Sequence, residues 1–95
     1  MKTAPRSVRQ AAEMLAIQAL GFIAEDPARL ALFLEATGIA GNEIRGAARE
    51  PGFLAGVLEH MLGDENLLTA FADSAGIDPA DIARARRRTW ERDTP

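Results

Sequence analysis

The sequence contains no cysteine and no tyrosine, and it has only one histidine and one tryptophan among 95 residues. Without cysteine there is neither a disulfide framework nor a thiolate metal site, and this absence fits a reducing compartment such as the cytoplasm. Catalysis needs titratable groups held within hydrogen-bond reach of each other, and so small a set offers few combinations. The composition therefore argues against an enzyme, and we expect no cofactor.

Long apolar runs are also missing. The longest nearly apolar stretch, residues 14–24, is 11 residues long and includes Gln18, whereas a membrane-spanning helix needs about 20. The basic first nine residues superficially resemble the start of a signal peptide, but Glu13 and Gln18 interrupt the hydrophobic segment that should follow. We therefore expect neither a secretory leader nor a membrane as partner.

Aromatic side chains are scarce in a chain that is otherwise rich in apolar residues. Apolar residues make up 47% of the chain, but only four Phe and one Trp are aromatic, so the core must come from Leu, Ile, Ala and Met. These residue types favour helices. A chain of this length forms one domain and buries about 60 to 70% of the surface of its unfolded state. We predict an all-α fold, with a single helical domain over residues 1–95.

Charge is unevenly placed along the chain, although the net charge is only −3. Residues 10–82 hold three Arg against 12 Asp and Glu, a balance of 3 − 12 = −9. Residues 1–9 carry +3, and residues 83–92 carry 5 − 1 = +4. Because an acidic body repels nucleic acid, only the two basic ends could attract it.

Capping residues mark the borders of several helices. Asp26 is a good N-cap ahead of Pro27, which suits the first helical position. Gly38 is a typical left-handed stop, and Ile39 after it can close a Schellman motif. Similar signals predict helices from Ser7, with Gln10 completing a capping box, to Ala24; from Asn42 to Arg49; from Pro51 to Gly63; and from Asp64 onward. The first helix is so apolar that we expect it to be buried, either as the central helix or against a second copy.

One segment of the chain is written almost twice. DPARLALFLEATGIAGNEI, residues 26–44, returns as DENLLTAFADSAGIDPADI, residues 64–82, at an offset of 38. The recurring positions are caps, core residues and glycine stops: Asp26 with Asp64, Leu30 with Leu68, Phe33 with Phe71, Gly38 with Gly76, Ile39 with Ile77, and Ile44 with Ile82. This pattern predicts two three-helix halves, at about residues 7–50 and 51–92. Because a solenoid needs at least three repeats, we expect the halves to pack face to face about a pseudo-twofold, as a compact bundle of about six helices.

Two small groups of residues suggest ligand chemistry, and each has a simpler structural explanation. His60 stands four residues before Asp64 and next to Glu59, so a lone metal ion is conceivable there. His60 aligns with the core residue Phe22 in the repeat, which favours a half-buried helical histidine capped by a nearby carboxylate and predicts no metal site. TGIAGNEI, around Gly38, resembles an anion-binding loop, but helix capping explains its glycine better because the second copy places aspartates there.

A helix-turn-helix spacing is the one pattern that points to a specific function. The second half supplies its positions as Ala72, Gly76, Ile77, Ile82 and Ala85, and the first half as Leu34, Gly38, Ile39, Ile44 and Ala47. The exposed start of a recognition helix should offer Arg, Lys, Asn, Gln or Ser to base edges. Two short sets of residues stand there: Asp78, Pro79, Ala80, Ala83 and Arg84 in the second copy, and Ala40, Gly41, Asn42 and Arg45 in the first. These sets are poor DNA readers, so the spacing describes helix packing better than DNA recognition.

The basic segment ARARRRTWER, residues 83–92, keeps a nucleic-acid alternative open. Its candidate contact residues are Arg84, Arg86, Arg87, Arg88, Trp90 and Arg92, with Trp90 able to stack on a base. The favoured interpretation is that the arginines stabilise the end of the last helix and pair with the acidic body, while Trp90 packs beside Arg86.

Residues 12–86 resemble a known family in several short segments: Leu20-Gly21-Phe22, Asp26-Pro27, the stops at Gly38 and Gly76, and Asp64-Glu65. These segments are similar to a family of short alphaproteobacterial proteins grouped as domain of unknown function three-five-seven-two. The resemblance implies an uncharacterised cytoplasmic helical protein with no assigned activity or catalytic residues. Together with the residue patterns, it favours a non-enzymatic domain that self-associates or binds an unidentified protein partner through an apolar helix surface.

Overall fold

The computed structural model describes residues 3–90, with side chains placed at residues 10–50 and 52–87. Over this range the chain forms six α-helices and one 3-10 turn: α1 (Thr3–Ala24), α2 (Pro27–Thr37), η1 (Gly41–Glu43), α3 (Ile44–Ala47), α4 (Pro51–Leu62), α5 (Glu65–Ala75) and α6 (Pro79–Trp90). No strand occurs between residues 3 and 90. The all-α prediction with six helices is therefore confirmed.

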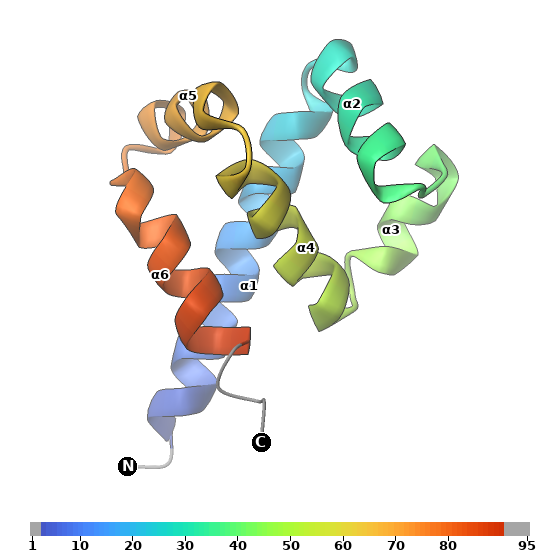
Figure 1. Ribbon diagram of the computed structural model, residues 1–95. Coiled ribbons are helices and arrows are strands. Elements are labelled where there is room, and N and C mark those ends of the chain that lie inside the picture. The colour runs from blue at the N-terminus through green and yellow to red at the C-terminus, as the bar shows by residue number, and fades with distance from the viewer. Residues whose placement is uncertain (1–2, 91–95) are drawn as a thin grey trace.

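Helices α1, α4 and α6 pack against one another and form the centre of the fold. Figure 1 shows α4 and α6 crossing in front of the long α1, with α2 and α5 at the end where α1 finishes and α3 at the edge between α2 and α4. The start of α1 and the end of α6 lie together at the opposite end. Segments far apart in the sequence thus share both ends of the molecule.

Small side chains on α1 allow this close packing. Ala12, Ala16 and Ala19 are buried on one face of α1, and Ile23 continues that face toward α2. The larger side chains that fill the core come mainly from the helices that cover this face: Phe33, Leu54, Val57, Leu58, Met61, Leu67, Phe71 and Ile82. Because alanine keeps the backbones close, leucine, isoleucine and phenylalanine from other helices can cover α1 without leaving voids.

The predicted N-caps are confirmed in the structure. The Asp26 carboxylate accepts a hydrogen bond of 2.9 Å from the Ala28 N–H, and Pro27 begins α2. The Asp64 carboxylate accepts one of 3.2 Å from the Leu67 N–H at the start of α5. Each cap satisfies a backbone donor that the first helical turn leaves unpaired.

Gly38 and Gly76 both adopt the left-handed conformation, with φ of 75° and 71°. At Gly76 both hydrogen bonds of the Schellman motif form. The Ile77 N–H donates to the Ala72 carbonyl at 3.0 Å, and the Gly76 N–H donates to the Asp73 backbone carbonyl. At Gly38 the Schellman prediction is wrong, and a single bond of 2.8 Å from the Gly38 N–H to the Leu34 carbonyl makes the simpler αL motif.

Thr37 explains this difference between the two helix ends. Its hydroxyl donates to the Phe33 carbonyl at 2.9 Å, and its oxygen accepts from the Ile39 N–H at 3.4 Å. The Ile39 amide is therefore drawn to a side chain instead of the Leu34 carbonyl. Ala75 holds the equivalent position in the second half and has no hydroxyl to compete.

We expect replacement of Gly76 by alanine to lower the free energy of unfolding by about 1 kcal/mol, because a Cβ at positive φ is strained even where space is open. The structure leaves nothing within 4 Å of that Cβ, so strain alone sets the cost. Gly56, inside α4, is the matched control: its Cβ also has open space, and Gly56→Ala should add about 0.5–1 kcal/mol. Urea denaturation of both variants measures the two signs, and a stabilised Gly76→Ala would contradict the account.

Two predicted helix borders are wrong. Helix α1 begins at Thr3, so Ser7 lies inside it and is not its N-cap. The third helix is α3, a single turn, and not the predicted span from Asn42 to Arg49. It is short because η1 uses the first residues, where the Glu43 carboxylate accepts from the Ala40 N–H at 3.0 Å, and because Gly46 disfavours helix ahead of Pro51.

The internal repeat stays a prediction. Caps and glycine stops recur at equivalent positions in the two halves, but the third helices differ: α3 is one turn long, whereas α6 has 12 residues and packs on both α1 and α4. The caps and glycine stops therefore recur in both halves, although the third helices differ in length and in the helices they pack against.

Candidate functional site

The most unusual surface of the protein is the outer face of α1. Met14 is 65% exposed and Ile17 is 49% exposed, although both are large apolar side chains. They lie one turn apart, with the exposed residues Gly21 and Ala24 one and two turns further along. We call this stripe the α1 seam; its residues are Gln10, Met14, Ile17, Gly21 and Ala24.

Helix α1 therefore has two apolar faces. The inner face holds Ala16 and Ile23, both fully buried under α4 and α6 or α2, and the outer face is the α1 seam. The prediction that α1 is the buried central helix holds for the inner face, while the outer face is exposed in the single chain. The alternative, burial against a second copy, stays a prediction. The residue spacing held the missing signal, since positions 14, 17, 21 and 24 form a separate stripe at alternating steps of three and four.

Charged side chains gather where α1 ends. Asp26, which caps α2, lies 3.9 Å from the Arg29 Nε, and Arg29 and Asp64 line the same hollow. At the other end of the fold, the backbone at the end of α6 lies beside the first half of α1 (Figure 1).

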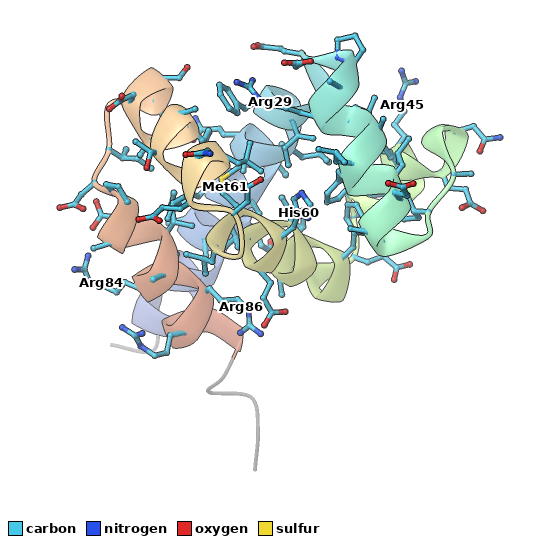
Figure 2. The ribbon with its side chains drawn as sticks, turned by 45° about the horizontal axis from the view of Figure 1, so that its top comes forward. Arg29, Arg45, His60, Met61, Arg84 and Arg86 are labelled. Atoms are coloured by element: carbon cyan, nitrogen blue, oxygen red, sulfur yellow. The ribbon has the colours of Figure 1, made fainter. Side chains whose placement is uncertain are left out.

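The structure describes three of the six residues named for nucleic-acid contact. Arg84 pairs with Asp81, and Arg86 reaches Glu59 on α4 at 3.0 Å, so two of the guanidinium groups already have carboxylate partners. Figure 2 shows Arg84 and Arg86 on different sides of α6. Arg87 is exposed. The side chains of Arg88 and Trp90, and all of Arg92, lie outside the part of the chain that the structure describes.

The Arg86 side chain is more buried than that of Arg84, which is 52% exposed. The Arg86 side chain is 24% exposed, and its Nε is buried without an acceptor among the described residues. The bond to Glu59 ties α6 to α4, so Arg86 stabilises the packing of two core helices. A guanidinium in that position presents little of itself to a phosphate.

Helices α5 and α6 do have helix-turn-helix connectivity, since residues 76–78 join them in a short turn with a glycine. The start of α6 is closed by its own cap, because the Asp78 carboxylate accepts from the Ala80 N–H at 2.9 Å. Acidic Asp78 and Asp81 are exposed there, where a DNA reader would present donors. In the first half, the single turn of α3 is too short to enter a groove.

His60 serves the packing of α4 against α2. Its ring meets the ring of Phe33 edge-on, with centroids 5.1 Å apart, and Figure 2 shows it reaching from α4 toward α2. Beside it lies a shallow hollow of about 190 Å³, lined by Arg29, Leu32, His60, Asp64, Asn66 and Leu67. Among residues 3–90 no three His, Asp or Glu side chains gather as metal ligands. The prediction that His60 is a half-buried helical histidine is confirmed. The contact that the structure shows for its ring is with Phe33, whereas the prediction paired it with a carboxylate.

One cation–aromatic contact was not anticipated from the sequence. The Arg29 guanidinium stands 4.4 Å from the centre of the Phe22 ring, while Asp26 lies 3.9 Å from its Nε. The predicted packing of Trp90 beside Arg86 falls on a side chain outside the described part of the chain, and it stays a prediction. Phe22 precedes Arg29 by seven residues across a helix–helix turn, and only the fold brings them together.

In the suggested anion-binding loop around Gly38, a carboxylate of the same loop already accepts a backbone N–H. Gly38 ends α2, and the next exposed backbone donor, the Ala40 N–H, is taken by the Glu43 carboxylate. A carboxylate at that position repels phosphate, so capping explains this segment, as the sequence favoured.

Between residues 3 and 90 no helix combines the length and the apolarity needed to cross a membrane.

Comparison with known proteins places the chain by family. The chain has no significant match to a curated protein or to a solved structure. A family model does match residues 9–89, under the description "Protein of unknown function (DUF3572)". Because that match covers most of the sequence, from the first turns of α1 to the end of α6, the chain belongs to the DUF3572 family.

Proposed function

We propose that the protein is a non-enzymatic interaction domain that self-associates through the α1 seam. The observation that carries the proposal is the exposure of Met14 and Ile17 on a helix whose opposite face already builds the core. Neighbouring exposed apolar side chains on a small monomer mark a surface that another molecule covers. The third large exposed apolar residue, Leu32, stands on α2 away from the seam.

The titratable side chains support a structural role more than catalysis. Asp64 caps α5, Glu59 and Arg86 pair across two helices, and His60 packs on a phenylalanine ring. A catalytic group needs a partner that tunes it and a cavity that holds substrate. The hollow beside His60 is shallow, and the Asp64 carboxylate that lines it already accepts a hydrogen bond from the Leu67 N–H.

The expected association is weak. The α1 seam runs over residues 10–24, about 21 Å of helix, so a contact strip about 10 Å wide offers roughly 200 Å² of projected area per partner. A standard interface buries about 800 Å² per partner. We therefore expect a dimer that forms at micromolar or higher concentration and exchanges with the monomer.

Light scattering behind a sizing column tests the proposal. We expect the mass of the wild-type protein to rise from monomer toward dimer as the concentration increases through the micromolar range. Met14→Glu combined with Ile17→Glu should weaken this association by about 100-fold or more, because pairing would bury four unpartnered carboxylates. Circular dichroism should show both proteins equally helical, since the two positions are exposed.

Leu32→Glu is the matched control, because it places the same charge on an equally exposed leucine outside the seam. It should dimerise like the wild type. A wild-type protein that stays monomeric at several hundred micromolar, or a Leu32→Glu variant that loses the dimer while the α1 variant keeps it, would refute the proposal.

Nucleic acid is the second candidate partner, and the basic composition of residues 83–92 is the observation in its favour. Against it, Arg84 and Arg86 have carboxylate partners and acidic residues flank the start of α6. Electrostatic binding would fall steeply with salt. Sub-micromolar binding to a duplex at physiological salt, lost when Arg84, Arg86, Arg87, Arg88 and Arg92 are changed to Ser, would place this candidate first.

The absence of cysteine supports a cytoplasmic location as part of the same proposal. A reducing compartment imposes no need for disulfides, and the core of this domain relies on burial alone. Fractionation of cells that express a tagged chain gives the direct measurement.

A further inference from the structure

We propose that the hollow beside His60 binds a free α-amino acid with a branched aliphatic side chain. Three helices supply its walls: Arg29 and Leu32 come from α2, His60 comes from α4, and Asp64, Asn66 and Leu67 come from the start of α5. None of these residues belongs to the α1 seam, so the site does not depend on the proposed self-association.

Two opposite charges face the hollow without pairing with each other. Arg29 and Asp64 both line it, and no ion pair joins them among the described side chains. The Arg29 guanidinium is held over the Phe22 ring at 4.4 Å, and its Nε lies 3.9 Å from the Asp26 carboxylate, beyond hydrogen-bond distance. Arg29 therefore keeps N–H donors for the carboxylate of a ligand.

The Asp64 carboxylate supplies the opposite charge. One of its oxygens accepts the Leu67 N–H at 3.2 Å, which fixes the side chain at the start of α5. A carboxylate has about four lone-pair sites, so Asp64 can also accept from an ammonium group. A ligand with a carboxylate and an ammonium on one carbon atom would place each charge against its complement.

The hollow also has an apolar side. Leu32 is 60% exposed and Leu67 is 7% exposed, and both line it. An aliphatic side chain packed between them would cover Leu32, the large exposed apolar residue that the α1 seam does not include.

Size restricts the ligand to a small molecule. The hollow has a volume of about 190 Å³, below the roughly 300–1,000 Å³ of pockets that hold drug-sized ligands. A polypeptide carries its terminal ammonium and carboxylate at opposite ends of the chain, so a partner protein does not offer both to one hollow. A free amino acid does.

Heteronuclear NMR titration of the isotope-labelled protein with L-leucine tests the proposal. A ligand of about nine non-hydrogen atoms in an open hollow should bind with a Kd of about 1 mM. The largest saturable shifts should occur at the amides of Leu32, Asn66 and Leu67. N-acetyl-L-leucine has no ammonium, L-leucinamide has no carboxylate and glycine has no side chain, so each should bind about tenfold more weakly or worse.

Two variants with matched controls test the charges on the protein. Asp64→Asn keeps an oxygen that can cap α5 and should weaken leucine binding by about tenfold. Asp78→Asn is its control, because Asp78 caps α6 in the same way through a bond of 2.9 Å to the Ala80 N–H, outside the hollow. Arg29→Gln should cause a similar loss, and Arg45→Gln, exposed on α3, should cause none. Circular dichroism checks that each variant is folded.

The ligand series uses the wild-type chain, so it decides the proposal even if a variant does not fold. No saturable shift at about 50 mM leucine, where a site with a Kd of about 1 mM is nearly full, would overturn the proposal. Equal affinities for leucine and N-acetyl-L-leucine would overturn it too, because Asp64 would then have no ammonium to bind. Shifts confined to other parts of the chain would refute the location.

Discussion

Replacing Phe33 with alanine should lower the free energy of unfolding by about 3–5 kcal/mol, the range for a buried phenylalanine reduced to alanine. Phe33 is fully buried on α2. Its ring meets Phe53 edge-on at 5.9 Å between centroids and His60 at 5.1 Å, so one ring connects α2 to both ends of α4. A domain of this size has a total stability of about 5–15 kcal/mol, so this loss removes a large fraction of it.

The neighbouring residue gives the control. Leu32→Ala deletes a side chain that is 60% exposed from the same helix, and should change stability by no more than about 0.5 kcal/mol. Urea denaturation followed by circular dichroism measures both variants. Similar losses for the two would show that Phe33 does not anchor α2, and that contacts elsewhere along α2 hold it in place.

Helix borders set by short-range chemistry could be predicted from the sequence. Asp26 and Asp64 cap helices, and Gly38 and Gly76 adopt positive φ, because each depends on a few neighbouring backbone groups. Even the error at Gly38 is local, since the hydroxyl of Thr37 diverts the Ile39 amide. The start of α1 was missed because Ser7 and Gln10 have the spacing of a capping box, although both lie inside the helix.

The candidate site could not be predicted in the same way, because it depends on which face of α1 the other helices choose. Both faces are apolar, and both repeat at helical spacing. Alanines on the inner face let α4 and α6 approach closely, while Met14 on the outer face would hold them apart. The choice is made by the packing of helices more than 25 residues away along the chain. Periodicity shows both stripes, but it does not say which of them the other helices cover.

The meeting of α1 and α6 also needed the fold. The sequence shows a basic start and a basic end, but it does not say whether they lie together. In the structure α6 runs back along α1, so the backbone at the end of α6 lies beside the first half of α1 (Figure 1). Only the packing of helices far apart in the sequence brings these two segments together.

The two halves invite a comparison of equivalent residues, Ile44 and Ile82. Ile82 on α6 is fully buried in the central core, whereas Ile44 at the start of α3 is half-buried at the edge. Deleting a methyl-rich side chain costs the lost burial and, in a packed site, the cavity that remains. The two isoleucines are equivalent in the repeat alignment, but they differ in burial, so their contributions to stability should differ.

We expect Ile82→Ala to destabilise the protein by about 2–5 kcal/mol and Ile44→Ala by only about 1 kcal/mol. The difference follows from the partners, since α6 packs on α1 and α4 together, while α3 contacts mainly its own 3-10 turn. Thermal and urea unfolding of both variants, each checked for helicity at low temperature, provide the comparison. Equal losses would mean that α3 is as integral to the core as α6, and they would favour two halves that are equivalent in packing as well as in sequence.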